Sequence, residues 1–168
     1  PRPQAPDDRR QTTDPVRMKR GFYTIMAAQF LSSLADNALL IAAMALLLEM
    51  HAAEWMAPLL KLFFVISYVL LAPFVGAFAD SRPKGRVMLI TNAIKFVGCG
   101  MLFWTVHPLL AHAVVGFGAA AYSPAKYGIL IELLPAEKLV AANGWIEGTT
   151  VLSIVLGTLL GGALISPR

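Results

Sequence analysis

Long apolar runs are the feature that most constrains this chain. Each of the five runs reaches the roughly 20 residues that a helix needs to cross a bilayer, and they cover residues 22–48, 59–78, 87–106, 109–134 and 139–165. The connections between them are short, which makes successive helices antiparallel neighbours. No strand alternation or coiled-coil heptad fits this pattern. We therefore expect an all-α membrane protein with five transmembrane helices.

Composition and charge placement support a membrane protein. Of the 168 residues, 57% are hydrophobic and 14% are charged, and the charges cluster beside the apolar runs, whereas a soluble domain spreads them over its surface. The net charge of +4 therefore reflects topology determinants and not a nucleic-acid patch. The single cysteine, Cys99, excludes a disulfide framework and a cysteine metal site, and we expect it to be a small buried side chain.

Lysine and arginine placement predicts the orientation. Basic residues precede the first run and occupy the second and fourth connections, whereas the first and third connections contain none; they are Arg17, Lys19, Arg20, Arg82, Lys84, Arg86 and Lys138. The positive-inside rule then places the N-terminus in the cytoplasm. Lys61, near the outer end of the second run, is expected to extend its ammonium to the interface.

The N-terminal segment differs from the rest of the chain. Residues 1–17 are polar and proline-rich without periodicity, and Met18 opens a basic segment that would be a normal start for an inner-membrane protein. We interpret residues 1–17 as a disordered extension or a gene-model artefact that is not native. Residues 18–168 are then expected to form a partial N-terminal transmembrane bundle, completed by a missing part of the same protein.

The first run carries a polar stripe centred on Asp36. A carboxylate at this depth costs about 2.5–3.5 kcal/mol on insertion scales. Gln29, Ser32, Ser33 and Asp36 follow the spacing i, i+3, i+4 and i+7 and so share one helix face, with the Asn37 amide beside them. An ionisable residue within a membrane span usually faces a bundle interior or a water-filled cavity. Asp36 and Asn37 are therefore candidates for a functional site.

Three further ionisable residues lie at depths close to that of Asp36. Lys126 comes ten residues before position 136, the centre of the fourth connection, and Glu147 comes eleven residues after it. Both therefore lie about 15 Å from the turn, which permits an ion pair, and Lys95 and Asp36 lie about 18 and 20 Å in from the same side. These charges can form a shared polar cavity, or they can simply hold the helices together.

Side chains beside the lysines extend this polar region. Tyr122 and Ser123 precede Lys126 by one helical turn and could solvate its ammonium or bind a ligand headgroup. Asn92 lies one turn before Lys95 on the same face, which favours a shared cavity. Glycines predict close helix packing in the same runs, most clearly Gly157-x-x-x-Gly161 followed by Gly162 in the fifth.

The second connection contains the most specific motif. Gly76 and Asp80, followed by Gly85 and Arg86, match the pattern G-x-x-x-D…G-R, which resembles the gate signature between the second and third helices of the major facilitator superfamily of transporters. Gly76 is expected to allow close helix approach, and Asp80 to cap a helix or pair with Arg86. The spacer at residues 81–84 is longer than the usual form. A generic basic cytoplasmic turn is the alternative interpretation.

Several segments resemble one family in particular, the bacterial lysophospholipid transporters. The likeness extends from residue 18 to about residue 165, and its specific parts are ADNALL at residues 35–40 and AYSPAKYG at residues 121–128; the other matching segments are residues 28–32, 72–76, 84–88, 118–120, 142–144 and Glu147. The resemblance implies five helices of the N-terminal six-helix half of a twelve-helix facilitator fold. It also implies the bacterial inner membrane as the location.

The family resemblance implies a function and its partners. These transporters move lysophospholipids, chiefly lysophosphatidylethanolamine, from the periplasmic leaflet for re-acylation by a cytoplasmic-side acyltransferase with acyl-carrier-protein synthetase activity. By this resemblance, Asp36 binds or gates the headgroup and Lys126 contacts its phosphate or closes the cytoplasmic side. Asn37, Tyr122, Lys95 and Glu147 are the remaining candidates for substrate binding or gating.

Two other functions remain open. The chain could belong to a proton-coupled drug or sugar transporter with Asp36 as its protonation site, or it could be a structural or assembly segment of a larger membrane protein. We expect no enzyme, cofactor or metal, because no catalytic triad or metal-type spacing is present. The three histidines, His51, His107 and His112, are expected to lie on the surface near the outer interface.

Overall fold

The computed structural model describes residues 15–104 and 106–165, and in these ranges it is built of five helices. They are α1 (Pro15–Glu49), α2 (Met56–Asp80), α3 (Lys84–Phe103), α4 (Pro108–Leu133) and α5 (Ala136–Ile165). The expected all-α fold is confirmed. Residues 1–14 of the expected N-terminal extension lie outside the described residues, but residues 15–17 are helical, since proline is favoured in the first turn of a helix.

The helix bounds differ from the apolar runs by a few residues. The third run was expected to continue to Val106, but α3 ends at Phe103. Helix α3 ends early because a new helix begins soon after it: Pro108 is the first residue of α4, and His107 is its N-terminal cap. The His107 side chain accepts a hydrogen bond from the Leu109 backbone N–H, and the chain must turn before the proline because the residue preceding it disfavours helix.

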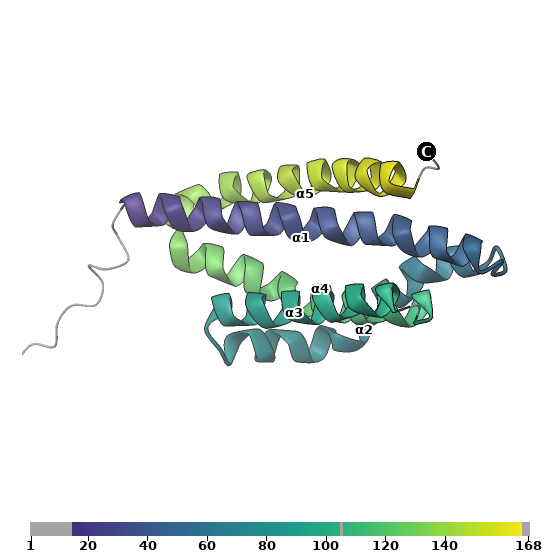
Figure 1. Cartoon of the computed structure of the whole chain (residues 1–168). Coiled ribbons are helices and arrows are strands. Elements are labelled where there is room, and N and C mark those ends of the chain that lie inside the picture. The colour runs from purple at the N-terminus through teal and green to yellow at the C-terminus, as the bar shows by residue number, and fades with distance from the viewer. Residues whose placement is uncertain (1–14, 105, 166–168) are drawn as a thin grey trace, which may run out of the picture.

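The helices form two layers (Figure 1). α1 and α5 lie side by side in one layer, and α4 packs between α2 and α3 in the other. The layers meet chiefly where α1 contacts α4, whereas α5 barely touches α4 although the two are joined by a short turn. This arrangement leaves polar faces of α1 and α4 turned toward each other.

Glycines allow the close helix contacts within each layer, as the small-residue spacing predicted. In the first layer, a Cβ atom on Gly157 would lie 2.5 Å from the Leu34 carbonyl oxygen of α1. In the second layer, a Cβ on Gly116 would lie 2.8 Å from the Phe64 backbone of α2, and one on Gly118 would lie 2.7 Å from the Thr91 carbonyl oxygen of α3. Two glycines of α4 therefore let it fit between its neighbours.

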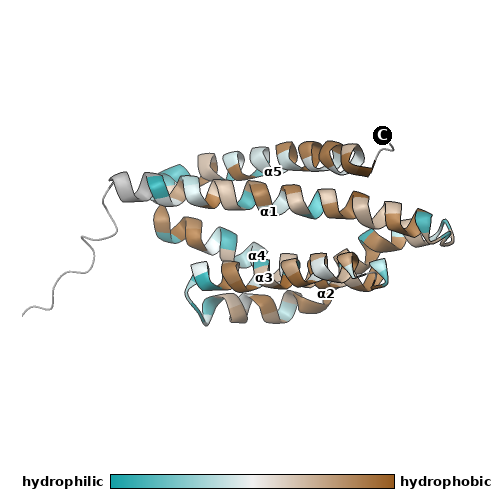
Figure 2. Cartoon of the chain, viewed as in Figure 1, coloured by the Kyte–Doolittle hydropathy of each residue, from teal (hydrophilic) through white to brown (hydrophobic). Residues whose placement is uncertain are grey.

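Most of the outer surface is apolar. Within the described residues, four helices are long and apolar enough to cross a membrane, namely α1 from Arg20, α2, α3 and α5. α4 does not meet this measure of length and composition. It is the central helix, and most of its first four turns are buried against protein. Figure 2 shows apolar residues along the outer helices and polar residues at the connections and within α1 and α4. Cys99, expected to be buried, is exposed on α3.

Candidate functional site

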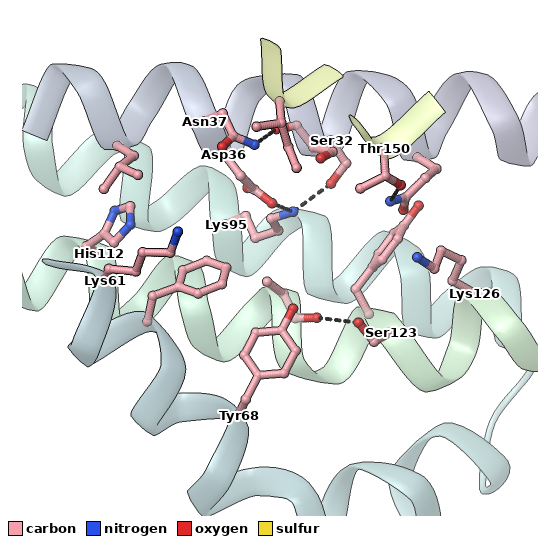
Figure 3. Close-up of a pocket in the computed structure, with 17 residues that line it drawn as sticks. Ser32, Asp36, Asn37, Lys61, Tyr68, Lys95, His112, Ser123, Lys126 and Thr150 are labelled. Carbon is pink, nitrogen blue, oxygen red and sulfur yellow. Dashed lines mark hydrogen bonds and ion pairs between the residues drawn. The ribbon is translucent and has the colours of Figure 1, made fainter. Parts of the chain in front are cut away.

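A cavity of about 240 Å³ lies between the two helix layers (Figure 3). All five helices contribute side chains to it, and α1 and α4 supply most of them. The lining residues are Gln29, Ser32, Ser33, Asp36, Asn37, Leu40, Lys61, Phe64, Tyr68, Lys95, His112, Ala119, Tyr122, Ser123, Lys126, Thr150 and Ile154. The polar stripe of α1 therefore faces the interior, as its spacing predicted.

The centre of the cavity holds an ion pair that joins the two layers. Lys95 Nζ on α3 lies 2.6 Å from Asp36 Oδ2 on α1, with side-chain exposures of only 10% and 19%. Lys95 Nζ also donates a hydrogen bond to Ser32 Oγ at 2.6 Å, and Ser32 donates in turn to Asn92 Oδ1 at 3.0 Å. Lys95 reaches α1 because Gly118 leaves room for it: a Cβ there would lie 2.6 Å from Lys95 Cγ.

Other polar residues of α1 hold the first layer together. Gln29 Nε2 donates to Thr150 Oγ1 of α5 at 3.0 Å. Asn37 lines the cavity, but its amide donates to the backbone oxygen of Ser33 at 2.8 Å, within its own helix. The carbonyl end of the Asn37 side chain accepts no hydrogen bond from any described residue, so it is free to meet a ligand.

Tyr122 contacts a different lysine from the one that its sequence position indicated. Lys95 Nζ lies 5.5 Å from the centre of the Tyr122 ring, a cation–π distance. Lys126 instead lies over the Tyr127 ring, at 4.4 Å. The Tyr122 hydroxyl is buried and has no hydrogen-bond partner among the described residues, which leaves one polar atom unpaired at the cavity wall.

The expected ion pair between Lys126 and Glu147 is present but loose. Lys126 Nζ lies 3.9 Å from Glu147 Oε1, and the Tyr127 hydroxyl donates to the same oxygen at 2.5 Å. Lys126 lines the cavity, whereas Glu147 does not and its side chain is 56% exposed. The pair therefore lies at the edge of the cavity, near the end where α4 turns into α5.

The sequence analysis missed several residues of the cavity, and Lys61 and His112 are the two of them with basic side chains. Lys61 was expected to extend its ammonium to the membrane interface; it is exposed, but it also lines the cavity. His112 was expected on the surface but is 3% exposed, and its ring lies 5.5 Å from that of Phe64. His112 comes 14 residues before Lys126, a spacing of about four helical turns. The two side chains therefore lie on the same face of α4, and His112 faces the cavity as Lys126 does. That spacing is the signal that could have found it.

The motif between α2 and α3 is arranged differently from the expectation. Asp80 forms an ion pair with Lys84 and not with Arg86, because Lys84 opens α3 directly after the turn and also donates to the Ala79 carbonyl at 3.1 Å. The expected close approach at Gly76 is wrong for the described residues: a Cβ at Gly76 or Gly85 would meet none of their atoms within 4 Å.

Fold and cavity together define a helical bundle of the facilitator type. The profile of the Major Facilitator Superfamily matches residues 22–167, and the chain belongs to this superfamily. With four helices apolar enough to cross a membrane, it is a multi-pass membrane protein.

Comparison with curated proteins narrows the similarity further. The chain is 49% identical over 152 residues to the lysophospholipid transporter LplT of Klebsiella pneumoniae; the aligned residues cover 90% of this chain and 38% of that protein. It is 47% identical to LplT of Yersinia enterocolitica over 151 residues, covering 90% of this chain and 37% of that protein. Against LplT of Escherichia coli O1:K1 the identity is 50% over 145 residues, covering 86% and 36%. The chain thus spans less than two fifths of these relatives, and no solved structure matches it.

Proposed function

We propose that this chain forms most of the N-terminal half of a longer transporter that moves lysophospholipids across the bacterial inner membrane. The superfamily match and the similarity to three relatives, all named lysophospholipid transporters, support this proposal. The placement of basic residues supports a cytoplasmic N-terminus. Lysophosphatidylethanolamine is the expected substrate class, re-acylated after transport by a cytoplasmic-side acyltransferase.

The observation that carries the proposal is the Asp36–Lys95 pair in the cavity between the layers. A zwitterionic headgroup carries an amine and a phosphate separated by an ethylene bridge, and an ion pair presents the two complementary charges side by side. Asp36 Oδ1 accepts no hydrogen bond from any residue within the described ranges, and Asp36 is more exposed than Lys95. The amine of the substrate therefore approaches Asp36 from the cavity, and the phosphate lies on the Lys95 side.

The apolar part of the substrate needs apolar walls. Leu40, Phe64 and Ile154 line the same cavity as the ion pair, so an acyl chain leaving the headgroup site meets apolar side chains. Lys126, Tyr127 and Glu147 lie where α4 turns into α5. We assign this group to closing the cytoplasmic side, because its loose ion pair can open without breaking the central one.

The test uses the full-length transporter in spheroplasts of a strain that lacks its own lysophospholipid transporter. The Asp36→Asn and Lys126→Gln variants should each lose uptake of labelled lysophosphatidylethanolamine without losing membrane expression. Lys138→Gln removes the same charge as Lys126→Gln from an exposed position of α5 and is the matched control. Normal uptake in both cavity variants would refute the site. Absence of uptake in the parent, with proton-driven export of a drug or sugar, would favour the alternative transporter class.

A further inference from the structure

A second group of polar side chains lies at the other end of the cavity from Lys126. It consists of Lys61 on α2 and His112 on α4, together with the Phe64 ring of α2 that packs against His112, and we refer to it as the outer cluster. α2 starts at Met56 and α4 at Pro108, so Lys61 and His112 both fall in the second turn of helices that begin at the same end of the bundle. Figure 3 shows both side chains on the same side of the ion pair.

The outer cluster contains polar groups that the described protein leaves unpaired. Lys61 makes no ion pair or hydrogen bond with any residue in the described ranges. His112 is 3% exposed, and its Nδ1 atom has no hydrogen-bond partner there. The Phe64 ring packs against the imidazole and holds it at the cavity wall. A buried nitrogen without a partner costs free energy, and a ligand that supplied a partner would recover it.

The charge balance of the cavity favours an anion at this cluster. Asp36 is the one carboxylate among the lining residues, and it is already paired with Lys95. Lys126 is loosely paired with Glu147, which lies outside the lining, so Lys61 is the lining cation that has no carboxylate partner among the described residues. His112 and Lys126 are separated by 14 positions of α4, which corresponds to about 21 Å along the helix. A headgroup whose charges are joined by an ethylene bridge cannot contact both ends at once.

We propose that Lys61 and His112 form a second subsite, which binds the phosphate group of the substrate before the headgroup reaches the Asp36–Lys95 pair. The Lys61 ammonium supplies the charge, and the His112 imidazole supplies a ring nitrogen as hydrogen-bond donor. The assignment of the phosphate to a lysophospholipid rests on the proposed function. The phosphate chemistry itself rests on the outer cluster alone.

Binding of phosphate compounds to the purified full-length transporter tests the subsite. Isothermal titration would compare sn-glycero-3-phosphoethanolamine, which is the headgroup without its acyl chain, with inorganic phosphate. In a background in which Asp36→Asn and Lys95→Met remove the central site, Lys61→Gln should weaken headgroup binding about 10- to 100-fold, the loss expected for one charge-assisted hydrogen bond. Lys61→Arg should retain most of the affinity, and Lys138→Gln should bind like the parent. A His112→Phe variant should also weaken binding, because it keeps the ring contact with Phe64 and removes the donor.

The outcomes separate the two possible ligands. Binding of the headgroup and not of inorganic phosphate supports a lipid subsite, whereas equal binding of both supports a general phosphate subsite. In the parent, the headgroup should also protect Lys61 more than the exposed Lys138 from an amine-acylating reagent, as mapped by mass spectrometry; Lys138 corrects for the reagent that the headgroup amine itself consumes. If the parent binds neither compound, or if Lys61→Gln binds like Lys138→Gln, the subsite is wrong.

Uptake by the same proteins in liposomes tests the proposed function separately. With the subsite present, Lys61→Gln should raise the KM for lysophosphatidylethanolamine by the same factor as it weakens headgroup binding. A parent that transports the lipid and a Lys61→Gln variant with unchanged KM would overturn the subsite alone. A parent that binds the headgroup but transports no lipid would overturn the proposed function alone.

Discussion

Removing one member of the central Asp36–Lys95 ion pair should lower the free energy of unfolding far more than removing both. Asp36 and Lys95 are 19% and 10% exposed in their side chains, so the pair counts as buried. Loss of one partner from a buried pair typically costs about 3–5 kcal/mol, because it leaves an uncompensated charge, whereas replacing both is often nearly neutral. The Asp36→Asn/Lys95→Met double variant should therefore stay within about 1 kcal/mol of the parent.

The two single variants should differ in a direction that the contacts predict. After Asp36→Asn, the Lys95 ammonium keeps the Ser32 hydroxyl at 2.6 Å and the Tyr122 ring at 5.5 Å. After Lys95→Met, the Asp36 carboxylate keeps no cation or hydrogen-bond donor among the described residues. The loss of stability should therefore be about 3 kcal/mol for Asp36→Asn, at the lower end of that range, and about 5 kcal/mol for Lys95→Met, at its upper end.

The assay is unfolding of the full-length transporter by SDS in mixed micelles, followed by far-ultraviolet circular dichroism. The double variant should recover stability but not lysophospholipid uptake, because the central site has lost both the carboxylate for the headgroup amine and the ammonium for its phosphate. Ser32→Ala is a useful reference, since it removes a single hydrogen bond worth about 0.5–1.5 kcal/mol. The reasoning is refuted if Lys95→Met costs no more than Asp36→Asn, or if the double variant is less stable than either single one.

Two further predictions concern the glycine contacts and the connection between α2 and α3. Gly157→Leu should destabilise the protein by about 1–3 kcal/mol or more, because a Cβ there meets the Leu34 oxygen at 2.5 Å. Gly162→Leu is the control: a Cβ at Gly162 meets no described atom within 4 Å, so stability should stay within about 0.5 kcal/mol of the parent. The same SDS unfolding compares the two variants. Asp80→Asn breaks the pair with Lys84, in which Asp80 is 79% exposed, so stability should change by less than about 1 kcal/mol. A large loss of stability would contradict this surface role, whereas a loss of uptake alone would support a gating one.

The helices could be predicted because a bilayer leaves the backbone few choices. A segment in the hydrocarbon region must satisfy its own hydrogen bonds, so an apolar run of sufficient length becomes a helix. The pairing of Lys126 with Glu147 followed for a similar reason: the two residues share one short turn, and depth along each helix is enough to bring them level. These predictions need only the rise per residue and the positions of the connections.

The remainder of the site depends on how each helix is rotated about its axis. Asp36 and Lys95 lie on helices that are not joined by a turn, and their contact requires the space that Gly118 of a third helix leaves. His112 was expected on the surface but is buried, because its orientation follows from the packing of α4 against Phe64. Depth can be read from one helix at a time, whereas rotation is a property of the packed bundle.

The pairing of α1 with α5 also has a consequence for biosynthesis. α1 is made first, but the helix that packs beside it is the last of the five. Lys95 follows Asp36 by 59 positions, which at a synthesis rate of about 5–20 residues per second means a delay of about 3–12 s. During that interval the Asp36 carboxylate enters the membrane without its partner cation. Until α3 has emerged, the apolar residues of α1 must therefore offset the cost of the unpaired carboxylate, about 2.5–3.5 kcal/mol on insertion scales.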